Sequence, residues 1–79
     1  MTGNTINNNG DSGVVAFSGT TLIGNTVRGN VVFGFDLICD FGACGYGSNV
    51  LGGNNGASSE VQGGVQIGTN ICNNTTTCP

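Results

Sequence analysis

The stretch GNTINNN at residues 3–9 returns as GNTVRGN at residues 24–30, 21 positions further along the chain. Two shorter copies of its first four residues follow, GSNV from Gly47 and GTNI from Gly68, so the four copies begin 21, 23 and 21 residues apart. A second similarity lies ten residues after the first two copies begin, where GVVAF starts at Gly13 and GFDLI at Gly34. Repeats with a period of about 20–50 residues indicate a solenoid, in which each repeat packs on the next.

The local composition favours strands over helices in each repeat. Glycine and β-branched residues dominate, no apolar period of 3.6 residues persists, and the short β-branched runs end at Gly or Asn. A leucine-rich repeat has a similar length but needs a column of leucines, and this chain has only Leu22, Leu37 and Leu51. We therefore predict an all-β solenoid of about three to four coils of roughly 21–23 residues, with parallel strands pairing from coil to coil.

The repeat also assigns the domain organisation and the core. Residues 1–79 are predicted to form one module, with coils starting near residues 3, 24, 47 and 68 and a C-terminal cap over residues 68–79. Residues at equal repeat positions should stack inward, which predicts one core column of Ile6, Val27, Val50 and Ile71 and a second of Val14 and Phe35. Alternation along the second strand then turns Ala16 and Leu37 inward and leaves Val15 and Asp36 outside.

Asparagines share a further repeat position. Asn9, Asn30 and Asn74 align there, while Gly53 interrupts the run in the third coil. A column of asparagines at a bend allows side-chain amides to bond from turn to turn, and Asn tolerates left-handed backbone. We therefore predict an asparagine ladder of Asn9, Asn30 and Asn74.

Composition excludes several classes of partner. A hydrophobic fraction of 37% with only 6% charged residues argues against a disordered chain. Arg28 is the only Lys or Arg and the net charge is −3, which excludes a phosphate-binding stripe for nucleic acid. No run of 18 apolar residues is present, so no membrane insertion is expected.

Four cysteines fall in two close pairs, Cys39 with Cys44 and Cys72 with Cys78. Four cysteines allow three pairings, and the sequence does not choose among them. Disulfides are favoured over a metal site because neither pair has C-x2-C spacing and the chain has no His. Disulfides indicate an oxidising, extracellular compartment, yet the start MTGNTINNNG has no signal peptide character, which suggests a piece of a longer protein.

The closing segment GGVQIGTNICNNTTTCP at residues 63–79, together with the GNTVRGN unit, resembles the C-terminal end of bacterial right-handed parallel β-helix repeat proteins. The resemblance covers nearly all of the chain. It implies a right-handed coil and a secreted or cell-surface origin. It does not imply one activity, because lyases, hydrolases, adhesins and plain spacers all use this fold.

Catalytic residue types are few. Arg28 is the only candidate base for a lyase-like reaction, and Asp11, Asp36 and Asp40 occupy different repeat positions, so no carboxylate cluster is predicted. A Ser or Cys nucleophile has no His partner. We expect no enzyme activity, no cofactor and no metal, and an exposed Phe33 or Phe41 would be the exception that suggests sugar stacking.

The ends of the coil suggest the function. The degraded repeat after Gly52, Glu60 and the pair Cys72 and Cys78 form a plausible C-terminal cap, whereas no charge precedes Asp11 at the N-terminal edge. The leading hypothesis is a structural module that extends or caps a rod and self-assembles end to end through open β edges into homo-oligomers or filaments. The alternative is a fragment of a polysaccharide-binding or polysaccharide-cleaving β-helix protein with its active turns upstream.

Overall fold

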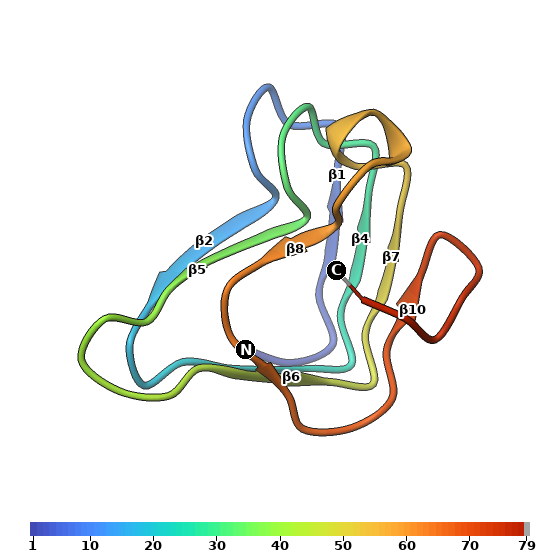
Figure 1. The fold of residues 1–79 in the computed structure, drawn as a ribbon. Helices are drawn as coiled ribbons and strands as arrows, with labels where there is room; N and C mark the ends of the chain where they lie inside the picture. Colours follow the sequence, from blue (N-terminus) through green and yellow to red (C-terminus); the bar gives the residue numbers. More distant parts are fainter. Residues whose placement is uncertain (79) are drawn as a thin grey trace.

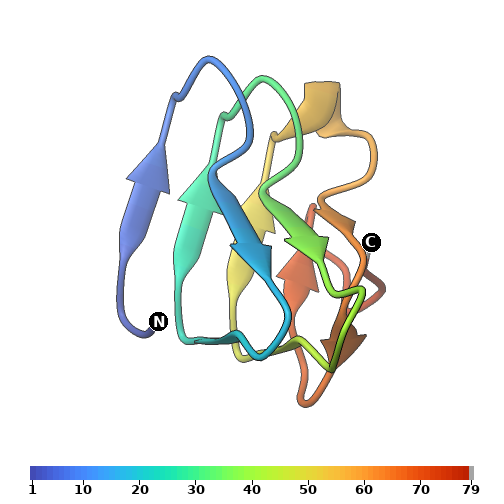
Figure 2. The ribbon, with the colours of Figure 1, turned by 90° about the vertical axis from the view of Figure 1, so that its left-hand side faces the viewer.

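The computed structural model, which describes residues 1–78, is a right-handed parallel β-solenoid (Figure 1). The chain completes three turns of three strands each and begins a fourth, and the turns stack side by side from the N-terminus to the C-terminus (Figure 2). The predicted all-β solenoid is therefore confirmed. No helix in the described part of the chain is long and apolar enough to cross a membrane.

Each strand pairs in parallel with its equivalent in the next turn, which produces three sheets around one core. The first sheet contains β1 (Thr5–Asn7), β4 (Thr26–Arg28), β7 (Val50–Gly52) and β10 (Ile71–Cys72). The second contains β2 (Val14–Phe17), β5 (Phe35–Ile38) and β8 (Val61–Gln62). The third contains β3 (Thr21–Ile23), β6 (Gly45–Gly47) and β9 (Val65–Gln66), and a 3-10 turn η1 (Asn55–Ala57) follows β7.

The second turn is longer than the first because of one loop. Residues 18–20 connect β2 to β3, whereas residues 39–44 connect β5 to β6. A disulfide between Cys39 and Cys44 closes this longer loop. The three additional residues shift every later strand, so Thr26 pairs with Val50 and Val27 pairs with Leu51.

The predicted first core column is therefore wrong beyond Val27. Ile6 pairs with Val27 as expected, but the column continues through Leu51 and Cys72 instead of Val50 and Ile71. Val50 lies on the outer side of the sheet and is 46% exposed, while Leu51 is buried, and Ile71 is half-buried. The alignment error comes from Ser48. This residue adopts the left-handed backbone (φ 56°) that Gly24 adopts one turn earlier (φ 68°), so Ser48 and not Gly47 is the equivalent of Gly24. Alignment on Gly47 places the third repeat one residue too early.

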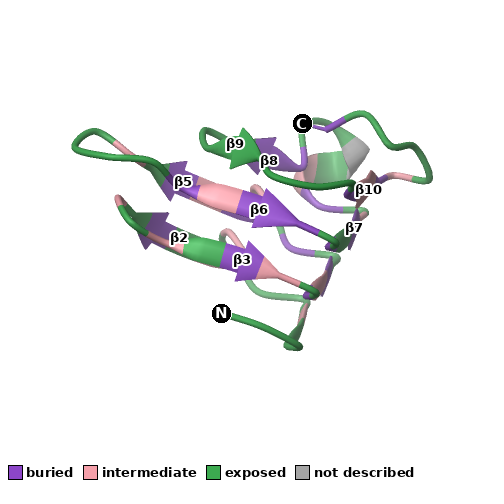
Figure 3. Ribbon diagram, turned by 90° about the horizontal axis from the view of Figure 1, so that it is seen from below, coloured by how far each residue is buried: buried purple, intermediate pink, exposed green. Residues whose placement is uncertain are grey.

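The core lies between the three sheets (Figure 3). In the second sheet, Val14 pairs with Phe35 and Phe35 with Val61; Phe35 is fully buried. Phe35 contacts Tyr46 of the third sheet edge-to-face, with ring centroids 6.1 Å apart. Ala16 and Leu37 are buried as predicted, and Val15 is exposed. Burying one such large side chain contributes about 1.5–3 kcal/mol, so this narrow core depends on a few residues.

Candidate functional site at the ends of the solenoid

Four asparagines form a ladder along the corner of the solenoid that precedes the strands of the first sheet. This first ladder consists of Asn4, Asn25, Asn49 and Asn70, of which the last three are buried. At each step the Nδ2 group donates to the Oδ1 atom of the next asparagine, at distances of 3.0, 3.1 and 2.9 Å. The backbone N–H of the same residue donates to that same Oδ1 atom, at 3.0, 2.8 and 3.0 Å. Each step therefore adds two hydrogen bonds, in one fixed direction.

A second ladder lies along the corner at which the chain leaves the strands of the first sheet. It consists of Asn9, Asn30 and Asn54, and Nδ2 again donates to the next Oδ1 atom at 2.9 and 2.8 Å. The backbone N–H groups of Asn9 and Asn30 donate to the same Oδ1 atoms at 3.0 and 2.9 Å. The predicted ladder of Asn9, Asn30 and Asn74 is thus correct at its first step only. Asn54 takes the third place because of the register shift, and Asn74 is exposed in the turn after β10.

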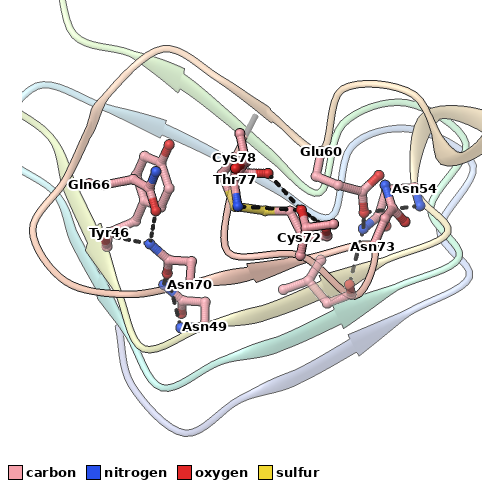
Figure 4. Close-up of a disulfide and its surroundings, with 12 residues drawn as sticks. Tyr46, Asn49, Asn54, Glu60, Gln66, Asn70, Cys72, Asn73, Thr77 and Cys78 are labelled. Carbon is pink, nitrogen blue, oxygen red and sulfur yellow. Dashed lines mark hydrogen bonds between the residues drawn. A yellow bond between two sulfur atoms is a disulfide. The ribbon is translucent and has the colours of Figure 1, made fainter.

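Both ladders end on an oxygen of a different residue type at the C-terminal side. Glu60 Oε1 accepts hydrogen bonds from Asn54 Nδ2 at 2.7 Å and from the Asn54 backbone N–H at 3.3 Å. Gln66 Oε1 accepts from Asn70 Nδ2 at 3.0 Å. Figure 4 shows Gln66 beside Tyr46 and Glu60 beside Asn54, each directed at the last asparagine of its ladder. Glu60 is fully buried, and its second oxygen, Oε2, has no hydrogen-bond partner among the described residues.

The C-terminal edge of the first sheet is also closed. Thr75 folds back on β10 in an antiparallel bridge, so that Cys72 N–H donates to Thr75 O at 2.8 Å and Thr75 N–H to Cys72 O at 3.1 Å. The disulfide between Cys72 and Cys78 holds this tail, and both cysteines are buried in the core cluster. Pro79, the last residue of the predicted cap, lies outside the described residues. A further parallel strand has no free edge at β10.

The N-terminal end has the opposite character. Asn4 and Asn9 are exposed, and no described residue donates a hydrogen bond to the Oδ1 atom of either one. Strands β1 and β2 each pair on one side only. Only the third sheet extends further, through Thr2, which bridges Ile23, and Met1, whose carbonyl accepts the Ile23 N–H at 3.0 Å.

The candidate catalytic residues do not converge. Arg28 lies in β4 of the first sheet, Asp36 in β5 of the second, Asp40 in the Cys39–Cys44 loop and Asp11 between β1 and β2. The described residues contain no group of three His, Cys, Asp or Glu side chains placed to hold a metal ion. One carboxylate oxygen of Asp36 is buried and has no hydrogen-bond partner within residues 1–78. Burial raises the pKa of Tyr46, the only tyrosine, above its ordinary value.

Two surface features remain. The Cys39–Cys44 loop presents Phe41, which is 96% exposed, and holds it through a hydrogen bond from the Phe41 N–H to Ser18 Oγ at 2.9 Å; Phe33 is half-buried. A groove of about 730 Å³ runs over the outer face of the first sheet, where Arg28 and Asn73 flank Gly52.

The first ladder was not predicted, because an alignment on Gly47 and Gly68 places Asn49 and Asn70 opposite Thr5 and Thr26 and not opposite Asn4 and Asn25. The signal was present: asparagines five residues apart occur as Asn4 and Asn9, Asn25 and Asn30, and Asn49 and Asn54. Comparison with protein-family models, curated proteins and solved structures found no match to this chain.

Proposed function

We propose that this chain is a structural β-solenoid module that closes the C-terminal end of a secreted or cell-surface rod and leaves its N-terminal edge available for extension. The observation that carries the proposal is the asymmetry of the two ladders. Glu60 and Gln66 end them at one side, and Asn4 and Asn9 leave them open at the other. A solenoid needs such a cap because its last turn otherwise exposes core and strand edge.

The two disulfides support the secreted or cell-surface setting, because disulfides persist in oxidising compartments. They close short loops, one between β5 and β6 and one in the C-terminal tail after β10 begins. The proposal assigns the chain no catalytic step and no cofactor.

End-to-end filaments of this chain are a narrower form of the same proposal. Stacking of copies needs free amide donors and a free strand edge at the C-terminal side. There the Asn54 and Asn70 side-chain amides are engaged and β10 is paired with Thr75, so both ladders and the first sheet are closed, while β8 and β9 each pair on one side only among the described strands. Filaments are therefore expected only when the cap opens.

The test is the oligomeric state of the oxidised chain, measured by light scattering over a range of concentrations and by negative-stain microscopy. We expect a monomer. Rods of uniform width formed by the intact chain would contradict capping and support a self-assembling subunit.

The groove on the outer face favours one second candidate, binding of a polysaccharide. It places the single basic side chain, Arg28, beside the open position at Gly52. An acidic oligosaccharide should shift the NMR signals of these residues, and a neutral oligosaccharide or an Arg28→Gln variant should not. Absence of any shift with the acidic sugar at millimolar concentration would remove this candidate.

A further inference from the structure

The open ends of the ladders have a defined chemistry. In every internal step, an asparagine Oδ1 atom accepts two N–H groups from the asparagine of the preceding turn. At the N-terminal edge, Asn4 Oδ1 and Asn9 Oδ1 receive neither. Between them lies β1, whose outer edge has no partner among the described strands. This edge therefore presents two acceptors on either side of one unpaired strand.

We propose that this edge binds the last turn of another parallel β-solenoid, one that carries two asparagines five residues apart with free amide groups. The inference rests on the proposed capping function and names the partner of the cap. The donor turn would repeat what Asn25 and Asn30 receive from Asn4 and Asn9. The edge would thus gain four hydrogen bonds to side-chain oxygens as well as the strand pairing.

The spacing of the two asparagines fixes the register of the partner. Asn4 and Asn9 flank β1 at a distance that recurs in the next two turns, at Asn25 with Asn30 and Asn49 with Asn54. A strand that slips by one residue turns its side chains to the opposite face. It would also move both asparagines away from their acceptors. A partner turn with a single asparagine, or with a different spacing, satisfies at most one ladder.

A second copy of this chain does not fit as the partner. Its β8 and β9 each keep one unpaired edge, but its Asn70 and Asn54 amides are bonded to Gln66 and Glu60 and its β10 edge is paired with Thr75, so neither the first sheet nor a ladder can continue into the next copy. Two N-terminal edges placed face to face would oppose acceptor to acceptor. The third sheet is already extended by Met1 and Thr2, so a partner turn enters along β1 and β2.

The experiment supplies the donor turn in the same polypeptide. Residues 3–23 are duplicated ahead of Gly3, which keeps the 21-residue spacing of the first two turns. One variant carries Asn4→Ala and Asn9→Ala in the added copy only. The matched control carries Asn7→Ala in the added copy, because Asn7 lies in β1 between the ladders and belongs to neither.

Hydrogen exchange then reports whether the added turn docks. We expect its strand amides to be protected in the unsubstituted duplication and in the Asn7 control. The ladder variant lacks the two Nδ2 donors of the added turn and should lose about tenfold or more of that protection. Protection that is independent of the two asparagines, or no protection at all, would overturn the inference. Light scattering on the 79-residue chain separates the two proposals: copies that stack through their C-terminal ends refute capping, whatever the added turn does.

Discussion

At the residue scale, the ladders depend on the dual chemistry of asparagine. Its amide donates through Nδ2 and accepts through Oδ1, so one residue can both receive the preceding turn and bond to the next. A buried amide is costly unless it is hydrogen-bonded. Asn49 shows how complete the bonding is: its Nδ2 group donates to Asn70 Oδ1 and also to the carbonyls of Leu22 and Gly47, at 2.9 and 3.0 Å.

The end of the second ladder yields a prediction for Glu60. Glu60→Ala removes the acceptor of two buried N–H groups of Asn54, and we expect the free energy of unfolding to fall by about 3 kcal/mol. Glu60→Gln keeps a carbonyl oxygen in this place, as Gln66 does for the first ladder, and should stay within about 1 kcal/mol of the wild type. Urea unfolding followed by circular dichroism measures both. Equal losses for the two variants would show that Glu60 is not needed as an acceptor.

Tyr46 gives a prediction for alkaline pH. Because burial raises its pKa, the folded state keeps the phenol neutral where the unfolded chain already ionises it. The contribution of Tyr46 to the free energy of unfolding should therefore be constant below pH of about 10 and fall as the pH rises above that value. The chain has one tyrosine and no Trp, so tyrosinate absorbance reports on Tyr46 alone. This absorbance should appear at higher pH in buffer than in urea. A Tyr46→Phe variant should lose this part of the pH dependence; identical titrations in buffer and urea would contradict it.

At the element scale, the sequence predicts the strands better than their register. The pairs Ile6 with Val27 and Val14 with Phe35 follow from the 21-residue period, because no insertion separates these turns. The register of β7 depends on the loop of residues 39–44 and on Ser48 in left-handed backbone. Glycine is the usual residue there, so the alignment chose Gly47. The ladder ends were not predictable either, since Glu60 and Gln66 reach the last asparagines from different parts of the turn.

Two neighbouring substitutions test the register of β7. Leu51→Asp places an unpaired charge beside Val27 in the core and should cost about 4 kcal/mol or more, which is enough to unfold so small a chain. Val50→Asp lies on the outer face and should cost less than about 1 kcal/mol. Thermal and urea unfolding compare them. The reverse order of the two losses would restore the register aligned on Gly47.

The glycines before β2 and β5 explain the second sequence repeat. A Cβ atom added at Gly34 would lie 2.6 Å from Leu51 Cδ2 and 2.9 Å from Asn54 Nδ2, so it would displace both the core and the second ladder. We expect Gly34→Ala to cost about 2 kcal/mol in urea unfolding. Gly52→Ala is the control, because nothing lies within 4 Å of its added Cβ atom. A loss at Gly34 no larger than at Gly52 would mean that the ladder tolerates a shift here.

At the scale of the whole molecule, the two ends decide how the protein behaves. Along its length the solenoid repeats one set of contacts, so neither end differs from the middle until something stops the pattern. At the C-terminal end three features stop the two ladders and the first sheet: the acceptors Glu60 and Gln66, the Thr75 bridge on β10, and the Cys72–Cys78 disulfide. At the N-terminal end the pattern remains open at β1 and β2.

Removing each disulfide in turn distinguishes a loss of stability from a loss of the C-terminal cap. They close loops of similar length, with sequence separations of 5 and 6, so removing either one should lower the free energy of unfolding by about 2 kcal/mol on the chain-entropy estimate. Only the Cys72→Ala/Cys78→Ala variant releases the tail from the core and from the β10 edge, which would then be free to pair with the open N-terminal edge of another copy. We expect this variant to form concentration-dependent oligomers in light scattering, while Cys39→Ala/Cys44→Ala stays monomeric at the same concentration. If both variants form oligomers, the association results from lost stability and not from an opened cap. If both stay monomeric, Glu60, Gln66 and the Thr75 bridge close the C-terminal end without the disulfide.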